Sequence, residues 1–444
     1  MSLEAHLLHV LTPWRQAPLW TLALSGGLDS LVLLHLLARL ARHQALPPLS
    51  ALHVHHGLQA FADEWAEHCQ AACAALDIPL TVCRVTVDSG ASVERAAREA
   101  RYAAFAEHLA PGALLLLAQH RDDQAETLLL RLLRGSGVQG LAAMPASRPL
   151  GQGWLLRPLL EVGRAELEQW AQAQGLHWVE DPSNRDTRLA RNFLRHEILP
   201  RLAQHWPAVS TVLARDAAQQ QEAASLLDEL AVEDLARAQT PAAPGWLPLP
   251  SLALAPLQVL SAARQRNALR YWLRGLTLLP PREHWVGWES LRDAGRDATP
   301  CWRLGQGELH RFAGRVWWLG GEWLSAPAMD RQAWPIPEQA LSLPGNGTVW
   351  LEGAAPGEPL QIRYRQGGEQ LVLAGRGRRD FKRLLQEAGV PPFVRERLPL
   401  LYASEQLLAV ANLPLPIAGS ADTLRLCWQP PDAPPLGSAR RAKV

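Results

Sequence analysis

The string Ser25-Gly26-Gly27-Leu28-Asp29-Ser30 constrains this chain more than any other segment. It follows an apolar run at 19–24 and precedes an apolar stretch at 31–37, a pattern that predicts a buried strand, a glycine turn and a core helix. Such a turn binds anions, because free backbone N–H groups and the helix dipole face it. The glycines let the backbone approach phosphate oxygens, and the two serines add hydroxyl donors. The string therefore predicts a phosphate-binding loop, although G-x-x-x-x-G-K-[ST] and G-x-G-x-x-G are both absent there.

The first 200 or so residues alternate strand-like and helix-like segments. Further strands are expected at 50–54, 80–87 and 113–118, and helices at 63–76, 94–109 and 122–134. Repeated β-α units of this kind predict an α/β fold with a doubly wound, mostly parallel sheet. In such a sheet, ligands bind at the carboxyl ends of the strands.

Length and composition predict further domains. A chain of 444 residues suggests two or three domains. Its character changes near Trp206, and proline-rich stretches interrupt it at 241–250 and 325–337. We expect four parts: an α/β domain with the glycine loop at 1–205, a central helical and mixed domain at 206–330, a small α+β domain at 341–430 and a disordered tail at 431–444.

Composition argues against several classes of protein. Five scattered cysteines without a C-x-x-C indicate neither a disulfide scaffold nor an iron–sulfur site. No signal-peptide pattern opens the chain, and its apolar runs are too short to span a bilayer. These features predict a protein of the reducing cytoplasm with no membrane partner. The net charge is +1, and the basic residues are nearly all arginine, with Lys382 and Lys443 the two lysines. We attribute the arginine excess to genome composition.

A second string, His120-Arg121-Asp122-Asp123-Gln124-Ala125-Glu126-Thr127, opens a helix directly after an expected buried strand. This order places it at the same sheet edge as the glycine loop. Asp123 and Glu126 are three residues apart and therefore share one helix face. Carboxylates there could hold Mg²⁺ on nucleotide phosphates or bind a cationic substrate. The alternative is simple acidic capping of a helix N-terminus.

Arginines gather in three further places. Arg98 and Arg101 lie within one helical turn, and Arg191-Asn192 with Arg195 follows the polar loop 181–186. Each of these groups could equally be an ordinary charged surface. Residues 361–400 hold nine basic and four acidic side chains, a local excess of five positive charges. An excess of this size on a near-neutral chain favours binding to a phosphate backbone, with a solvated face as the alternative.

Taken together, these strings resemble the tRNA(Ile)-lysidine synthetase family of PP-loop ATP pyrophosphatases over nearly the whole chain. In the first half the matching strings are 25–30, 53–58, Glu94 with 98–102, 120–127, 134–141, 156–159, 180–184 and 191–192. In the second half they are 382–387, 390–392 and 395–401. One departure is Arg121, a position where many members carry another residue.

The resemblance implies a PP-loop fold related to the adenine nucleotide α-hydrolases and a ligase that forms a carbon–nitrogen bond. It makes 1–205 the ATP-binding catalytic domain, 206–330 a tRNA-contacting domain and 341–430 a tRNA-binding domain. ATP would adenylate the wobble cytidine of a tRNA(Ile) with a CAU anticodon, and free L-lysine would then displace AMP. The product, lysidine, changes codon reading from AUG to AUA.

The resemblance also assigns residues to ATP, Mg²⁺, lysine and tRNA. ATP would bind Ser25, Gly26, Gly27, Leu28, Asp29 and Ser30; Asp29, Asp123 and Glu126 would be catalytic; Asp29 and Asp122 would hold Mg²⁺; and Asp123 and Glu126 would bind lysine. The expected tRNA contacts are Arg98, Arg101, Arg157, Arg191, Asn192, Arg195, Arg376, Arg378, Arg379, Lys382 and Arg383.

Two alternatives stay open from the residues alone. One is another PP-loop enzyme, either a tRNA thiolase or an amidotransferase-type synthetase, although paired cysteines and a glutaminase domain are both lacking. The other is a non-catalytic tRNA-binding protein on the same scaffold, against which the intact Ser25, Asp29, Asp123 and Glu126 argue. The sequence leaves the oligomeric state open, a homodimer included.

Overall fold

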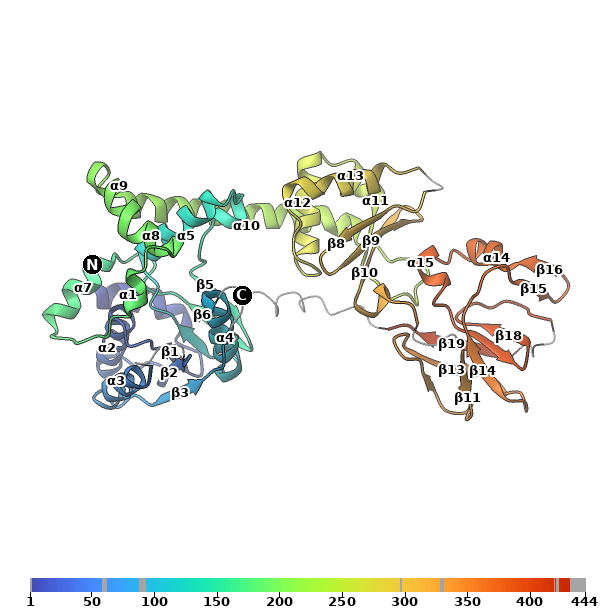
Figure 1. Ribbon diagram of the computed structural model, residues 1–444, viewed down its shortest axis with the longest axis horizontal. Helices are drawn as coiled ribbons and strands as arrows, with labels where there is room; N and C mark the ends of the chain where they lie inside the picture. Colours follow the sequence, from blue (N-terminus) through green and yellow to red (C-terminus); the bar gives the residue numbers. More distant parts are fainter. Residues whose placement is uncertain are drawn as a thin grey trace. The chain divides into compact units, whose positions relative to one another are not determined.

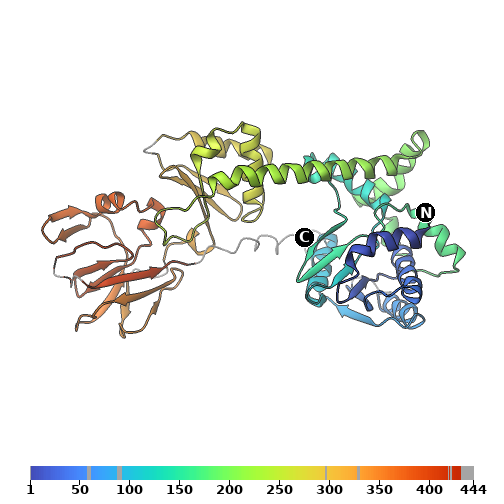
Figure 2. The ribbon, with the colours of Figure 1, turned by 180° about the vertical axis from the view of Figure 1, so that it is seen from behind.

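The computed structural model describes residues 2–57, 62–87, 93–295, 298–327, 331–418, 420 and 423–431. The chain forms two compact units, of which the first ends at residue 226 and the second begins at residue 227 (Figures 1 and 2). Leu58, the side chain of Glu94 and the expected tail beyond residue 431 lie outside the described parts. The domain boundaries at 205, 330 and 341 stay predictions.

The helices and strands of the first unit follow the expected alternation. They are α1 (Leu3–Leu11), β1 (Trp20–Ala23), α2 (Leu28–His43), β2 (Leu49–His55), α3 (Ala62–Ala74), β3 (Leu80–Arg84), α4 (Val93–His108), β4 (Leu114–Leu116), α5 (Arg121–Leu133), α6 (Val138–Leu141), β5 (Ser147–Leu150), β6 (Gly153–Leu156), α7 (Arg164–Ala173), α8 (Ala190–Phe193), α9 (Leu199–His205) and α10 (Val209–Ala238), which continues past residue 226.

A six-stranded sheet with the order β3-β2-β1-β4-β6-β5 forms the centre of the first unit. Neighbouring strands from β3 to β6 are parallel, and β5 joins the edge as the antiparallel partner of β6. The expected α/β fold with a mostly parallel sheet is thus confirmed. The β5–β6 hairpin was not expected from the sequence.

Side chains along the central strands alternate between two apolar layers. Leu114 and Leu116 of β4 pack in one layer with side chains of α1, α2, α3 and α7. Leu115 points to the opposite layer, where Tyr102 and Phe105 of α4 cover the sheet. Because both faces are buried, the strands are continuously apolar, as parallel strands usually are.

The strand order reverses at β1, which pairs with β2 on one side and β4 on the other. Trp20 lies opposite both Leu49 and Leu114 in this arrangement. Ligands bind in the crevice at the carboxyl ends of strands where such an order reverses. The segment after β1 is the glycine loop, and the segment after β4 leads to His120, so the topology brings the two strings together.

The second unit is rich in antiparallel strands. Its elements are β7 (Ser251–Ala253), α11 (Leu254–Gln258), α12 (Ala262–Leu273), α13 (Val286–Asp293), β8 (Cys301–Leu304), β9 (Gly307–Phe312), β10 (Arg315–Gly320), β11 (Arg331–Trp334), β12 (Leu341–Ser342), β13 (Thr348–Glu352), β14 (Leu360–Arg363), β15 (Gln370–Leu373), β16 (Gly377–Asp380), α14 (Phe381–Glu387), α15 (Pro392–Arg395), β17 (Leu400–Ala403), β18 (Gln406–Val410) and β19 (Arg425–Gln429). The four sheets have the orders β7-β10-β9-β8, β11-β14-β17-β18, β12-β13-β19 and β15-β16.

One large apolar core runs through much of the second unit and joins Trp317 and Trp323 to Trp334 and Trp428. The buried Arg397 ties the same segments together. Its Nη1 donates to the carbonyl oxygens of Glu322 at 2.5 Å and Ser325 at 2.8 Å, and its Nη2 donates to that of Gly345. In the described part of the chain, no helix is both long and apolar enough to cross a membrane.

Candidate functional site

The glycine loop forms a tight cradle between β1 and α2. Gly26 has a φ of +83°, and a Cβ atom there would come within 3.1 Å of the Cys69 sulfur, so glycine is required for both conformation and space. The Ser25 and Ser30 hydroxyls lie 3.1 Å apart, and the Ser30 hydroxyl donates to the Gly27 carbonyl at 3.0 Å. Gly27 is the N-cap of α2 and has no side chain to cap its first turn. The amides of that turn therefore face the loop, as phosphate binding requires.

His120 links this loop to α5. The imidazole is 1% exposed, and its Nε2 lies 3.6 Å from Asp29 Oδ2 in the loop and 3.5 Å from Asp123 Oδ2. Its backbone N–H donates to Asp123 Oδ2 at 3.1 Å, and the Asp123 N–H donates to the imidazole at 3.4 Å. His120 thus caps α5 and holds Asp29 and Asp123 at one place. This histidine lies within the string 120–127, and the sequence indicated no role for it.

The charges around His120 decide its protonation. Burial alone lowers the pKa of an imidazole, but the hydrogen bond with Asp29 and the charges of Asp123, Asp29 and Asp122 outweigh it and raise the pKa of His120. Burial likewise opposes ionisation of Asp123, yet His120, Arg191 and Arg195 hold the pKa of this carboxyl below its usual value. The neighbouring carboxylates thus raise the pKa of His120, and the neighbouring cations lower the pKa of Asp123.

Asp123 and Glu126 share one face of α5, as expected, and both meet arginines. Arg191 donates from Nε to Glu126 Oε2 at 2.8 Å and from Nη2 to Asp123 Oδ1 at 3.0 Å. Arg195 donates from Nε to Glu126 Oε1 at 2.5 Å and from Nη2 to Asp123 Oδ1 at 2.9 Å. Two carboxylates and two guanidinium groups thus form a neutral, largely buried network. From the sequence, the carboxylates were expected to bind lysine and the arginines to bind tRNA, with no contact expected between them.

The segment that carries the two arginines is α8 followed by a π-helical turn, Leu194–Ile198. Single π turns inside helices occur often at functional sites. Asn192 on α8 is buried, and its amide donates to the carbonyls of Ser183 at 2.9 Å and Asp186 at 3.0 Å. These bonds fix the polar loop 181–186, while a tRNA contact of Asn192 stays a prediction.

Arginines surround the buried Tyr102 on α4. The guanidinium carbons of Arg98 and Arg148 lie 4.8 and 5.2 Å from its ring centroid. Burial raises the pKa of Tyr102, but Arg98, Arg157 and Arg148 together lower it. Arg157 is itself buried, and its Nη1 donates to the Pro145 carbonyl at 2.7 Å. The structure thus brings Arg98 and Arg157 together with Arg148, which sequence reasoning missed because it lies on the unexpected β5.

Arg101 is close to this group and is half-buried. Burial lowers the pKa of Arg101. The charge of Tyr102 raises it, and the charges of Arg98 and Arg191 lower it further. Excess positive charge of this kind attracts phosphate groups. The assignment of Arg98, Arg101 and Arg157 to tRNA stays a prediction.

The expected basic group of the second unit lies on the β15–β16 hairpin and the start of α14. Its exposed members are Arg376, Arg378, Arg379, Lys382 and Arg383. Arg383 pairs with Glu387 at 3.0 Å, whereas no described residue forms an ion pair with the other four. Arg395 and Arg397, also counted in the local charge excess, are buried, so they cannot contact a phosphate backbone as folded.

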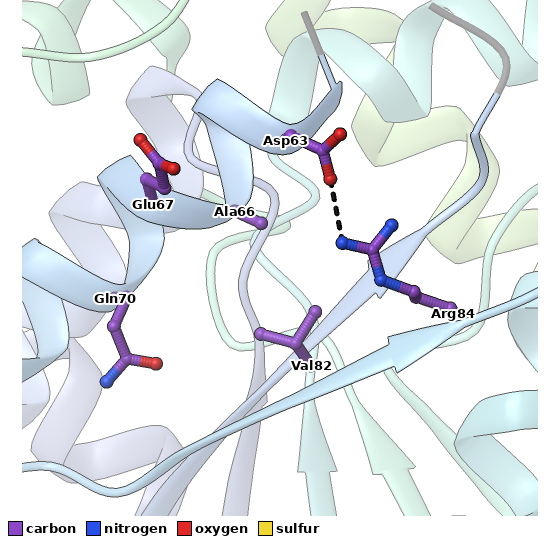
Figure 3. A pocket seen from close by; sticks show the side chains of 6 residues that line it. All are labelled: Asp63, Ala66, Glu67, Gln70, Val82 and Arg84. Atoms are coloured by element: carbon purple, nitrogen blue, oxygen red, sulfur yellow. Dashed lines mark hydrogen bonds and ion pairs between the residues drawn. The ribbon is translucent and has the colours of Figure 1, made fainter.

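An open hollow of about 770 Å³ lies between α3 and β3 (Figure 3). Asp63, Ala66, Glu67, Gln70, Val82 and Arg84 line it, and Arg84 donates to Asp63 Oδ1 at 2.7 Å. None of these residues belongs to the expected site, and Arg84 and Asp63 pair with each other. It therefore adds nothing to the cluster around His120.

The carboxylates of the loop cluster suit a magnesium ion at one position. Asp29 Oδ1 is buried and has no hydrogen-bond partner among the described residues, as expected of an oxygen that faces a cation. Asp122 Oδ2 already accepts the N–H of Arg164 at 2.8 Å. Of these two carboxylates, Asp29 therefore suits Mg²⁺ better than Asp122.

Comparison with known proteins agrees with this geometry. Residues 1–202 match the model of a PP-loop domain, 252–317 that of a TilS substrate binding domain and 360–429 that of a TilS substrate C-terminal domain. The chain is 61% identical to the tRNA(Ile)-lysidine synthase of Pseudomonas aeruginosa, covering 98% of this chain and 99% of that one. It is 58% identical to the enzyme of Pseudomonas fluorescens (97% and 98% covered) and 46% identical to that of Alkalilimnicola ehrlichii (89% and 89%).

Proposed function

This chain belongs to the tRNA(Ile)-lysidine synthase family, and we propose that the residues around His120 are where its ATP and lysine meet the target cytidine. The observation that carries the proposal is the convergence of the glycine loop, Asp29, His120 and Asp123 at the strand-order reversal. The activity is that of an ATP-using ligase that modifies tRNA(Ile).

ATP binds with its phosphates on the loop 25–30, where the α2 amides and the Ser25 and Ser30 hydroxyls donate to phosphate oxygens. Asp29 would hold Mg²⁺ through Oδ1, which has no hydrogen-bond partner among the described residues, and Asp122 lies on the other side of His120, 3.8 Å from its Nδ1. When bound, Mg²⁺ neutralises phosphate charge. His120 Nε2 lies 3.6 Å from the other carboxylate oxygen of Asp29, Oδ2, and orients this side chain. His120 is therefore a positioning residue.

The chemistry proceeds in two steps at the cytosine C2 position. The C2 oxygen first attacks the α-phosphorus of ATP, and the bond to the bridging oxygen breaks as pyrophosphate leaves. The lysine amine then attacks C2, the C2–O bond breaks with loss of AMP, and the nitrogen gives up its proton. The loop amides hold the phosphates while charge builds on the leaving oxygens.

Lysine is recognised through its positive charge by Asp123 and Glu126. Lysine has two amino groups, and the one that does not attack C2 stays protonated. This ammonium replaces a guanidinium donor at one or more oxygens of the two carboxylates, which already hold Arg191 and Arg195. A released guanidinium can then bind a phosphate of ATP or tRNA, since guanidinium groups match phosphate geometry. This exchange reconciles the two separate assignments made from the sequence.

The anticodon region of tRNA(Ile) approaches the half-buried Arg98, Arg101 and Arg148 around Tyr102, and the tRNA body binds the exposed basic group on β15, β16 and α14. A single cytidine cannot identify one tRNA, so a second contact is needed for discrimination. The reaction takes place in the cytoplasm, where ATP, free lysine and tRNA are present together.

The proposed activity is tested by measuring the modified nucleosides of tRNA(Ile) and the release of pyrophosphate in the same reaction. Full-length protein is incubated with tRNA(Ile) transcript, ATP and Mg²⁺, with or without lysine. We expect lysidine by mass spectrometry only when lysine is added, with release of AMP. A parallel incubation with an added sulfide source tests the thiolase alternative, which lysine-independent sulfur incorporation would favour. Binding of tRNA without any ATP turnover would favour the non-catalytic alternative.

A further inference from the structure

The second unit carries a group of metal-binding side chains far along the chain from the catalytic residues. β8 and β9 form an antiparallel pair in which Cys301 lies opposite His310 and Arg303 lies opposite Glu308. Opposed residues, and residues two apart on a strand, share one face of a sheet. The pairing therefore places the thiol, the imidazole and the carboxylate on one face.

The opposite face of the same two strands is apolar. Trp302 and Leu309 are buried there and pack in the core with α12 and α13 side chains. The alternation fixes the register, because a slip of one residue would turn Trp302 outward. Burial of Trp302 and Leu309 thus keeps the three polar side chains on the opposite face of the two strands.

Distances within the trio are short. Cys301 Sγ lies 3.3 Å from Glu308 Oε2 and 3.6 Å from His310 Nε2, and His310 Nε2 lies 2.9 Å from Glu308 Oε2. In the described part of the chain, these three residues form the one group of three or more potential metal ligands whose atoms all lie within 4.8 Å of one another.

These separations are close to those of a tetrahedral zinc site. Bonds of about 2.3 Å to sulfur and 2.0–2.2 Å to nitrogen and oxygen place donors roughly 3.4–3.6 Å apart. The distance between the thiol and the imidazole lies in this range. The distances from the Glu308 carboxylate to the thiol and to the imidazole are shorter, by up to about half an ångström. Small side-chain rotations would open space for an ion, since Cys301 is exposed.

Neighbouring residues orient two of the three ligands. Arg303 Nε donates to the other carboxylate oxygen of Glu308 at 3.1 Å, which leaves Oε2 toward the thiol and imidazole. The His310 ring packs against Phe393 of α15 with centroids 5.4 Å apart. Such outer contacts are typical of metal sites, where they fix the direction of each ligand.

We propose that Cys301, Glu308 and His310 bind one Zn²⁺ ion, with water as the fourth ligand. A thiolate, an imidazole and a carboxylate together suit zinc better than Mg²⁺, which prefers oxygen donors. Because His310 contacts Phe393, the ion would fix the orientation of a ring at the junction between the β7–β10 sheet and α15.

Proton release should accompany binding. A divalent ion binds the thiolate form of Cys301, so the bound complex loses the thiol proton and affinity rises with pH.

The experiment uses the full chain stripped of metal and titrated with Co²⁺, whose thiolate complexes give a charge-transfer absorption band. We expect the band to saturate at one Co²⁺ per chain and to be displaced by Zn²⁺. Cys301→Ser and His310→Gln should abolish it. Cys427→Ser is the matched control, because Cys427 also interacts with a carboxylate, Glu352, in the same unit.

Two outcomes would overturn the proposal. One is the absence of the band from the native chain at Co²⁺ concentrations well above the protein concentration. The other is a band that persists in Cys301→Ser or disappears in Cys427→Ser. The buried face of β8 and β9 holds the two strands in place. Circular dichroism should therefore show that Cys301→Ser and His310→Gln stay folded.

Discussion

Arg195 donates hydrogen bonds to both carboxylate oxygens of Glu126, from Nε to Oε1 at 2.5 Å and from Nη2 to Oε2 at 3.0 Å. Glu126 is 1% exposed, so its charge has been removed from water and is compensated by arginine. Removing one partner of such a pair leaves an uncompensated buried charge, which is costly. The proposed exchange with lysine avoids this cost, because one cation takes the place of another.

Glu126→Gln should raise the lysine KM about 10- to 100-fold, since losing a charge-assisted hydrogen bond costs about 1.5–3 kcal/mol. The ATP KM should change much less. Steady-state AMP release at varied lysine and varied ATP measures both. Glu166→Gln is the control, because Glu166 pairs with Arg121 at 3.3 Å in an exposed position. If ATP affinity falls instead, the carboxylate serves Mg²⁺ and the lysine assignment is wrong.

Asp29→Asn should abolish tRNA-dependent pyrophosphate release while tRNA binding and the fold are retained. The substitution keeps the size of the side chain but removes the charge that its buried Oδ1 offers to a cation. Pyrophosphate assays across a Mg²⁺ titration measure the loss, with filter binding of tRNA(Ile) as the control. Near-normal pyrophosphate release by the folded variant would contradict the role of Asp29.

Protonation of His120 should stabilise α5 at mildly acidic pH. Its pKa is raised in the folded state, so the contribution is complete below the unfolded value near 6.5 and is lost as pH rises through the folded value. Hydrogen exchange of α5 amides should show more protection in the native chain than in His120→Gln at about pH 6. The difference should shrink toward pH 9. A difference that grows with pH would mean that the imidazole is held neutral.

Removing the unpaired charges of β16 and α14 should weaken tRNA binding and its dependence on salt. Each of Arg378→Gln, Arg379→Gln and Lys382→Gln should lower the salt slope by about 0.9 if the side chain contacts one phosphate. Arg363→Gln is the control, because Arg363 is paired with Glu405 at 2.7 Å. Equal slopes for all four variants and the native chain would make this basic group a solvated surface.

Point substitutions are preferable here to deletion of the C-terminal part. The core of the second unit joins Trp317 and Trp323 to residues beyond 337, so a chain ended near Pro337 would expose these rings. Weak tRNA binding by such a truncated chain would then report misfolding as readily as lost contacts.

The sequence predicted the sheet because burial on both faces leaves a continuous apolar pattern, as in 113–118. It also placed the glycine loop and Asp123 at one edge, since strand order follows from repeated β-α units. It did not predict that Arg191 and Arg195 contact Asp123 and Glu126, because contacts across more than 60 residues depend on how α8 packs against α5. Nor did counting charges distinguish the buried Arg397 from the exposed Arg378.

The use of arginine at 191 and 195 has a consequence for the fidelity of the reaction. The second step places an activated cytidine beside a nucleophilic amine, and any lysine side chain of the protein itself is chemically equivalent to that substrate. Arginine supplies positive charge without a usable nucleophile, because its guanidinium stays protonated. Residues 1–381 contain no lysine at all. The first unit can thus neutralise its carboxylates without offering the intermediate a side-chain amine of its own, so self-modification by a neighbouring lysine is avoided.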